Sequence, residues 1–156
     1  MNAYAALVRR LGRTRAFAGV ASRLLPPIDR RFAHSRRSLA SFGTGFPLCY
    51  LTTTGRRTGK RRTTPLLYVG DGDRFVVIGS NFGNRRDPAW VANLRASPAA
   101  VVSVEGVSHA IVARAATSGE RDAYWRQAVR VWPGYEDYAR RAGRELPIVV
   151  LEPRDG

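Results

Sequence analysis

The chain has 156 residues, which is enough for one domain with a single hydrophobic core, and a hydrophobic content of 44% excludes a wholly disordered chain. It is strongly basic, with 26 lysines and arginines against 12 acids, and the excess lies mainly in residues 1–62, where Asp29 is the only acid. Cys49 is the single cysteine, which excludes an internal disulfide or a thiolate metal cluster and suits a reducing cytoplasm.

Residues 1–45 are expected to form a basic helical arm that precedes the main domain. From Tyr4 to Leu25 apolar residues recur near helical spacing with arginines between them, and Pro26-Pro27 ends the segment. The arginines leave no signal-peptide core and no spanning segment. Such a helix can pack on its own domain, or residues 1–25 can lie on an anionic membrane. We therefore expect a cytoplasmic protein, with peripheral binding at the inner face of the cell membrane left open.

Residues 46–79 predict three sequential strands. The β-branched and apolar runs lie at Phe46 to Thr54, Thr63 to Val69 and Arg74 to Gly79, and Asp71-Gly72 is a tight-turn signal before the last of them. Sequential strands with short connections form an antiparallel meander.

The second half of the chain alternates helices with strands. We expect Asp87 to cap a helix from Ala89 to Arg95 with Pro88 as its first residue, and Thr117 with Glu120 to form the capping box of a helix that runs to about Val131. A hairpin with strands at 99–104 and 107–115, a short helix at 135–142 and a closing strand at 148–151 complete the pattern. Residues 46–156 thus predict a mainly β fold with peripheral helices, a six-stranded antiparallel split β-barrel.

The segment Leu51 to Tyr68, LTTTGRRTGKRRTTPLLY, is the most unusual part of the sequence. Two threonine-rich strands flank a hairpin with Gly55 and Gly59, and five of the seven residues from Arg56 to Arg62 are basic. Guanidinium groups match phosphate or carboxylate in bidentate fashion, and glycine N–H groups can complete an anion site. The alternative is a solvated basic turn.

The sequence gives little support for catalysis by protein groups alone. It has no Gly-x-Ser-x-Gly elbow, Cys49 lies within a strand, and His34 and His109 have no metal-ligand spacing. A bound cofactor is therefore expected to supply the chemistry. Trp132, Tyr135 and Tyr138 are spaced to line one side of a flat cavity, although core packing explains them equally well.

Five separated motifs, TTTGRRTGKRRTTPL, GSN, DPAWVANLRASP, PGYEDY and LPIVVLEP, resemble the deazaflavin-dependent nitroreductase family over about residues 48–153. The resemblance implies an FMN-binding-like split barrel that binds coenzyme F-420, a deazaflavin with a phosphate and a polyglutamate-type tail. It also implies that Arg56, Arg57 and Arg62 grip the phosphate and tail, with Lys60 and Arg61 nearby.

The resemblance further implies the remaining site residues. Tyr135 and Ser80 are the expected catalytic residues, and Trp132, Tyr135 and Tyr138 the expected substrate contacts. The expected cofactor-binding set is Arg56, Arg57, Thr58, Arg62, Thr63, Thr64, Pro65, Leu66, Leu67, Ile78, Gly79, Ser80, Asn81, Ala89, Trp90, Val91, Ala92, Asn93 and Tyr135. Arg57 and Asn81 stand where some members have lysine, which weakens the expected contact to the tail.

The implied activity is hydride transfer from reduced coenzyme F-420 to a small activated acceptor such as a quinone, a nitroaromatic or an enone. Two alternatives remain: an FMN- or haem-using barrel of the same fold, and a basic module that binds nucleic acid or a membrane surface. We expect no specific nucleic-acid partner, no metal, and a monomer or a homodimer.

Overall fold

The computed structural model describes residues 45–154, so the predicted N-terminal arm lies outside the described residues except for Gly45. Six strands form in this part: β1 (Leu48–Thr54), β2 (Arg61–Asp71), β3 (Arg74–Ile78), β4 (Ala99–Val104), β5 (Val107–Ala115) and β6 (Ile148–Pro153). The helical elements are the 3-10 turn η1 (Asn81–Gly83) and the helices α3 (Ala89–Ala96), α4 (Ser118–Val131) and α5 (Gly134–Ala142). The strands and helices predicted for residues 46–153 are all present, with ends shifted by a few residues.

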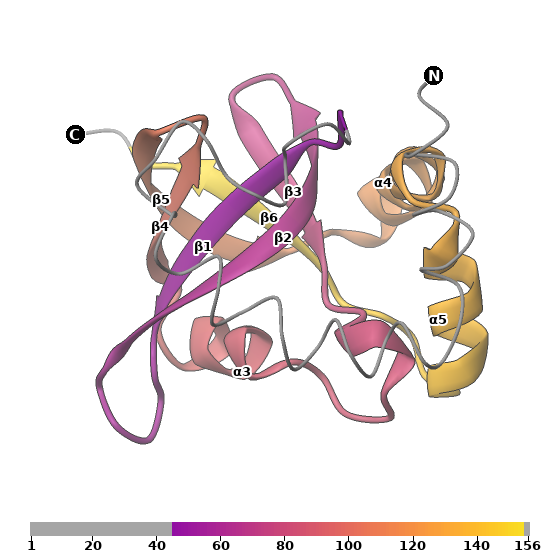
Figure 1. Cartoon of the computed structure of the whole chain (residues 1–156), viewed down its shortest axis with the longest axis horizontal. Helices are drawn as coiled ribbons and strands as arrows, with labels where there is room; N and C mark the ends of the chain where they lie inside the picture. Colours follow the sequence, from indigo (N-terminus) through magenta and orange to yellow (C-terminus); the bar gives the residue numbers. More distant parts are fainter. Residues whose placement is uncertain (1–44, 155–156) are drawn as a thin grey trace.

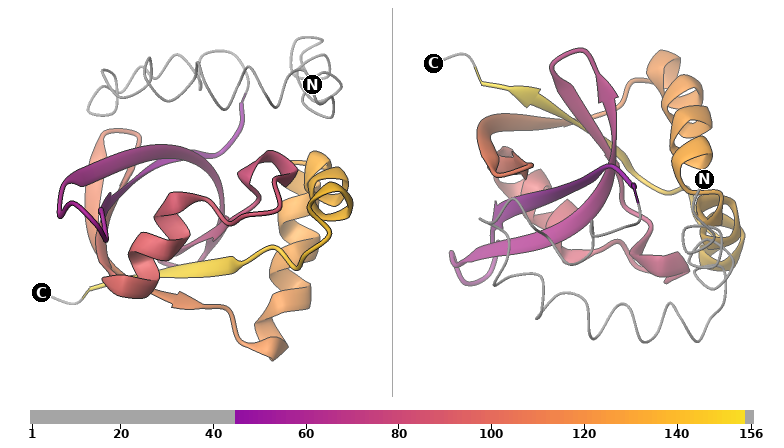
Figure 2. Two further views of the ribbon diagram at one scale, coloured as in Figure 1. Left: turned by 90° about the horizontal axis from the view of Figure 1, so that it is seen from below. Right: turned by 45° about the horizontal axis from the view of Figure 1, so that its top comes forward.

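The six strands close into a barrel in the order β1-β2-β3-β6-β5-β4, and β1 pairs with β4 to complete it. Every neighbouring pair is antiparallel. Figure 2 shows the closed ring of strands in its left view. The last strand, β6, inserts between β3 and β5, and its first four residues, Ile148 to Leu151, are apolar and buried on both faces of the wall. The predicted six-stranded antiparallel barrel is confirmed.

Alternate residues of β3 and β6 pack on opposite faces of the barrel wall. Val77 joins a core inside the barrel together with Cys49, Leu51 and three residues of α3, which lies across one end of the barrel (Figure 1). Val76 and Ile78 point the other way, into a second core beneath α4 and α5. The barrel wall is therefore buried on both sides where the helices cover it.

Two predicted helix ends are confirmed and one is wrong. Thr117 and Glu120 form the capping box of α4, and Gly143 ends α5 in the left-handed conformation with φ 61°. For α3, however, Pro88 is the residue before the helix and Asp87 gives no side-chain cap. The carboxylate of Asp87 instead accepts hydrogen bonds from Arg95 and Arg144, because two cations attract it more strongly than free backbone N–H groups.

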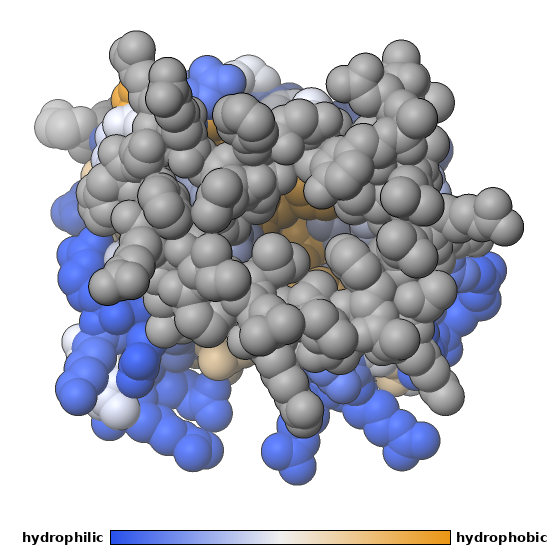
Figure 3. Space-filling model, in the orientation of Figure 1, coloured by the Kyte–Doolittle hydropathy of each residue, from blue (hydrophilic) through white to orange (hydrophobic). Residues whose placement is uncertain are grey.

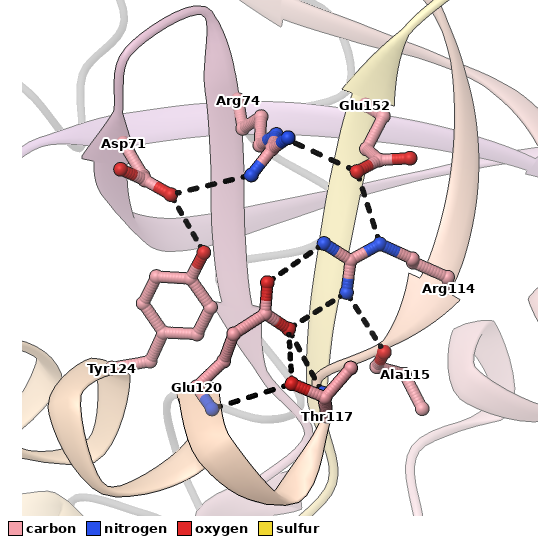
Figure 4. A network of polar contacts seen from close by, with 8 residues as sticks. All are labelled: Asp71, Arg74, Arg114, Ala115, Thr117, Glu120, Tyr124 and Glu152. Atoms are coloured by element: carbon pink, nitrogen blue, oxygen red, sulfur yellow. Dashed lines mark hydrogen bonds and ion pairs between the residues drawn. The ribbon is translucent and has the colours of Figure 1, made fainter.

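A polar network ties α4 to the barrel at the end of β2 that lies away from the β1–β2 hairpin (Figure 4). Arg114 binds Glu120 at 2.8 and 2.9 Å and Glu152 at 3.0 Å, and the Tyr124 hydroxyl donates to Asp71 at 2.6 Å. The Arg114 side chain lowers the pKa of Glu120 to about 2. The network therefore stabilises the docking of α4. None of the helices within residues 45–154 combines the length and the apolar character needed to cross a membrane.

Candidate functional site

The tip of the β1–β2 hairpin is a tight, glycine-dependent loop. The Gly55 N–H donates to the Lys60 carbonyl at 2.8 Å, and the Gly59 N–H donates to the Gly55 carbonyl at 2.7 Å. Gly59 has φ 67°, and a Cβ on Gly55 would lie 2.8 Å from Thr58 Oγ1. Both glycines are thus required by the loop geometry, and the loop leaves room only for backbone at its base.

The basic side chains of this loop are exposed and are not neutralised by acids of the described residues. Arginines elsewhere in residues 45–154, such as Arg95 and Arg114, form ion pairs. No such pair occurs within this part of the chain for the hairpin cations Arg56, Arg57, Lys60, Arg61 and Arg62. Figure 3 shows the hydrophilic surface that gathers over the hairpin, at the lower left. A cluster of uncompensated guanidinium groups is stabilised when an anion with several oxygens binds it.

Asn93 fixes the base of the hairpin to α3. Its side chain is buried, at 6% exposure, and both ends of its amide are used. Oδ1 accepts a hydrogen bond from the Arg56 backbone N–H at 3.1 Å, and Nδ2 donates to Thr53 Oγ1 at 3.1 Å. Asn93 is one of the expected cofactor contacts, and its two hydrogen bonds also hold the basic loop in place.

The first half of β2 presents an open backbone edge next to the hairpin. β3 pairs only with Tyr68–Asp71, so in the described part of the chain residues 61–67 have a strand on one side alone, β1. The Tyr68 N–H donates to Pro47 on the β1 side, and antiparallel bonding alternates, so the backbone groups of Thr63 and Leu67 face the open edge. The predicted ring contacts therefore include backbone groups that are available to a ligand.

The last residue of β3 and the loop after it carry the next predicted contacts, Ile78 to Asn81. The Gly79 N–H donates to the Pro147 carbonyl at 2.8 Å, and a Cβ on Gly79 would lie 2.9 Å from both Pro147 and Val91. Ser80 is half-buried, and Asn81 has the left-handed φ of 44°. This loop is therefore fitted closely to the rest of the domain, and its shape depends on contacts outside itself.

Arg144, which sequence reasoning did not select, supplies many of those contacts. Its guanidinium lies within hydrogen-bond distance of the carbonyls of Gly79 and Ser80 and of the carboxylate of Asp87. The residue is about 60 positions away in the chain, and no local pattern indicated the contact.

The predicted contacts on α3 separate by position. Trp90 and Val91 point into the barrel core and are 4% and 2% exposed, whereas Ala89 is exposed and Ala92 is half-buried. A ligand at this helix start would meet Ala89, Ala92 and backbone groups, because the larger side chains are already packed.

The aromatic group is buried in the core beneath α4 and α5. Trp132, Tyr135 and Tyr138 are 7%, 7% and 3% exposed. The ring centroids of Tyr135 and Tyr138 lie 6.2 Å apart in an edge-on arrangement, and Phe46 packs on Trp132 at 5.6 Å. The three side chains thus pack together in the core, which is one of the two arrangements that the sequence left open. Their role at a substrate remains a prediction.

The Tyr135 side chain is buried beside the other aromatic residues. Burial raises its pKa above the ordinary value, and among residues 45–154 its hydroxyl has no hydrogen-bond partner. Tyr135 lines a narrow gap together with Leu67 and Ile78, which belong to the two predicted ring-contact segments, and this gap has no room for a water molecule. A buried hydroxyl that pairs with no residue of the described part of the chain suits a ligand that brings its own acceptor. By contrast, Cys49 is fully buried and its pKa is raised to about 12, so it is an inert core thiol, as expected.

These features fit a ligand with an anionic tail and a flat polar ring. The hairpin cations and the glycine loop suit the tail, and the open edge of β2, the loop after β3 and the Tyr135 hydroxyl suit the ring. Within the described residues no group of three or more histidines, cysteines and acids could hold a metal ion.

Comparison with known proteins agrees with this geometry. A family model described as F-420H(2)-dependent quinone reductase matches residues 28–153. An F-420H(2)-dependent quinone reductase of Mycobacterium tuberculosis is 32% identical over 116 residues, which cover 69% of this chain and 74% of that protein. A solved F-420-H(2) dependent reductase is 30% identical with a TM-score of 0.63, covering 68% of this chain and 94% of its own. A solved domain-swapped dimer, also 30% identical, has a TM-score of 0.64 and covers 68% and 80%.

The family resemblance expected from the five motifs is confirmed, and so are the oxidoreductase class and the dependence on reduced coenzyme F-420. The site residues named from the resemblance are carried forward as proposals. With its six-stranded barrel, its basic glycine hairpin and a family match that spans most of its length, this chain belongs to the F-420H(2)-dependent quinone reductase family.

Proposed function

We propose that this protein transfers a hydride from reduced coenzyme F-420 to a small activated acceptor such as a quinone, a nitroaromatic or an enone. The observation that carries the proposal is the set of exposed hairpin cations without acid partners among the described residues, placed beside the open backbone edge of β2. Family membership supports the coenzyme, and the choice among acceptors is our own inference.

The hairpin would hold the anionic part of the coenzyme. Arg56, Arg57 and Arg62 are the proposed phosphate and tail contacts, with Lys60 and Arg61 adding charge from the same loop. Guanidinium forks bind phosphate and carboxylate in bidentate fashion, and the glycine loop lets the backbone approach closely. Thr58, at the tip, already accepts a hydrogen bond from the Lys60 N–H at 3.2 Å, which keeps the loop closed.

The ring would lie along β2 and the loop after β3. The open backbone edge at Thr63 to Leu67 supports contacts to the polar rim of a flat ring, and so does the loop from Ile78 to Asn81. Residues at the start of α3, Ala89 to Asn93, would close the remaining side. Exclusion of water from the ring would come from the apolar surroundings of Leu67 and Ile78.

When bound, the reduced coenzyme would supply a hydride, and it is a poor one-electron donor. The protein residues therefore have only to orient the acceptor and to supply one proton. Burial keeps the Tyr135 hydroxyl protonated throughout the physiological range, because its pKa is raised. We propose that Tyr135, or Ser80 in the adjacent loop, donates a hydrogen bond or a proton to the acceptor oxygen. Trp132 and Tyr138 would shape the acceptor site from the buried core.

Fluorescence titration of the purified protein with coenzyme F-420 and, separately, with FMN tests the choice of cofactor. Saturable quenching with F-420 is expected, and binding of FMN alone would overturn the choice. Replacing Arg56 and Arg62 together by Ala should weaken F-420 binding and make the remaining binding less salt-sensitive. The matched control replaces Arg126 and Arg130, two exposed arginines of α4, and removes the same charge. An equal loss in both double variants would show a general charge effect in place of a specific site.

Assembly and membrane binding are separate proposals. The solved domain-swapped dimer supports a homodimer as one of the two expected states, and light scattering after size exclusion distinguishes it from a monomer. Residues 1–25 lie outside the described residues, so their proposed contact with an anionic membrane rests on sequence alone.

A further inference from the structure

We propose that Arg144 is a positioning residue that holds the loop between β3 and α3 in the conformation that receives the coenzyme ring. The inference rests on the proposed function, since it is this loop that carries the ring contacts Ile78 to Asn81 and the proposed catalytic Ser80. Arg144 itself follows α5 and precedes β6, so it acts from outside the site.

One guanidinium group gathers acceptors from the whole length of this loop. The Arg144 side chain is 17% exposed, and all three of its nitrogens donate. Its partners are the carbonyls of Asn84 (3.1 Å), Arg86 (3.1 Å), Gly79 (3.3 Å) and Ser80 (3.4 Å) and the carboxylate of Asp87 (2.6 Å). The planar fork of a guanidinium can serve several carbonyls at once, and the charged bond to Asp87 fixes its orientation.

The loop needs this support because its own backbone is not in a relaxed conformation. Asn81 and Phe82 have φ values of 44° and 54°, which are sparsely populated for residues with side chains. The loop's internal backbone bonds are few: Ser80 N–H to Ile78, Gly83 N–H to Ser80 and Asn84 N–H to Asn81.

Neighbouring elements fit the loop on two further sides. The Gly79 N–H donates to the carbonyl of Pro147, three residues after Arg144, and the Gly79 carbonyl accepts from Arg144. The same connecting segment therefore bonds to both backbone polar groups of Gly79. Gly83 lies against α5, where an added Cβ would lie 3.1 Å from the backbone of Tyr138. The loop is thus held by α5 and by the lead-in to β6, and among residues 45–154 Arg144 is the side chain that hydrogen-bonds to both Gly79 and Ser80.

A lysine at position 144 would not reproduce the arrangement. An ammonium group is a compact point charge with three donors, so it can keep the pair with Asp87 but cannot also reach carbonyls at both ends of the loop. R144A and R144K should therefore both raise the dissociation constant for coenzyme F-420, by about tenfold for R144A, because several hydrogen bonds to one charged group are lost.

The test compares wild type, R144A, R144K and R121A by F-420 fluorescence titration and by urea unfolding. Arg121 is the matched control, since it also donates to a backbone carbonyl, Leu146 at 2.6 Å, and pairs with Glu145, yet it has no hydrogen bond to the loop. Millimolar guanidinium chloride is then added to each variant, with sodium chloride of equal ionic strength as the reference. We expect guanidinium to recover part of the affinity of R144A and to leave R121A unchanged.

An R144A dissociation constant equal to that of wild type would overturn the inference, and so would a loss of affinity in R121A of the same size. If R144A does not fold, R144K keeps the cation and the stem, and an unchanged affinity there would likewise refute the positioning role. A wild-type protein that binds no F-420 at all would instead reject the proposed function, and this inference with it.

Discussion

Replacing Asn93 by Leu is the sharpest test of how the hairpin is held. Leucine has nearly the same size but leaves two groups without their partner, the Thr53 hydroxyl and the Arg56 backbone N–H. Thr53 is 2% exposed, so its hydroxyl cannot turn to water, whereas Arg56 is exposed and its N–H can be solvated. We expect N93L to lower the free energy of unfolding by about 2–4 kcal/mol, most of it from the buried hydroxyl.

The informative measurement is the dissociation constant for coenzyme F-420, because loss of the Arg56 bond should free the basic loop and lower its affinity several-fold. The control is T53V, which removes the same buried bond to Asn93 but leaves the hydrogen bond that the Arg56 N–H donates to Asn93 Oδ1. T53V should lose stability and keep its affinity. The reasoning is refuted if N93L binds F-420 as tightly as wild type under conditions in which both proteins are folded. It is also refuted if T53V loses as much affinity as N93L.

Three further predictions follow from the described contacts. Tyr135→Phe should lower turnover with little change in the F-420 dissociation constant, and stopped-flow oxidation of the reduced coenzyme measures it; a full rate in the variant contradicts a proton role. Glu120→Gln should lower the melting temperature at neutral pH, since Arg114 depresses the Glu120 pKa from 4.5 to about 2, and the difference should vanish as pH falls through that range. Gly55→Ala should reduce F-420 affinity, because the added Cβ meets Thr58 Oγ1 at 2.8 Å, and titration of this variant checks it.

The parts of the fold that were predictable depend on short-range chemistry. The capping box of α4 is written in four consecutive residues, and the turn expected between the strands at 99–104 and 107–115 falls at Glu105-Gly106, with φ of 50° and 83°. β2 is longer than the predicted Thr63 to Val69, because its register with β1 continues to Arg61 and its register with β3 to Asp71. Pairing partners set those ends, and composition does not show them.

The candidate site was predictable where a motif carries it and hidden where tertiary contacts build it. The basic glycine hairpin is visible in the sequence, but the bond from Arg56 to Asn93 spans 37 positions. Asp87 is a residue type that often caps helices, and it precedes α3. The predicted cap was wrong because Arg144, far along the chain, binds the Asp87 carboxylate instead. Long-range partners of this kind leave no periodic or local signal.

The edge of β2 that has no neighbouring strand within residues 45–154 is a site where unwanted association can begin as well as a site for a ligand. A bare row of strand backbone is a template on which another chain can add, and such addition is a common first step of aggregation. Pro65 removes one donor from that row, and the cationic neighbours Arg61 and Arg62 repel a second copy of the same edge. The protein without its coenzyme should therefore stay dispersed at low salt and lose that protection as salt screens the hairpin charges.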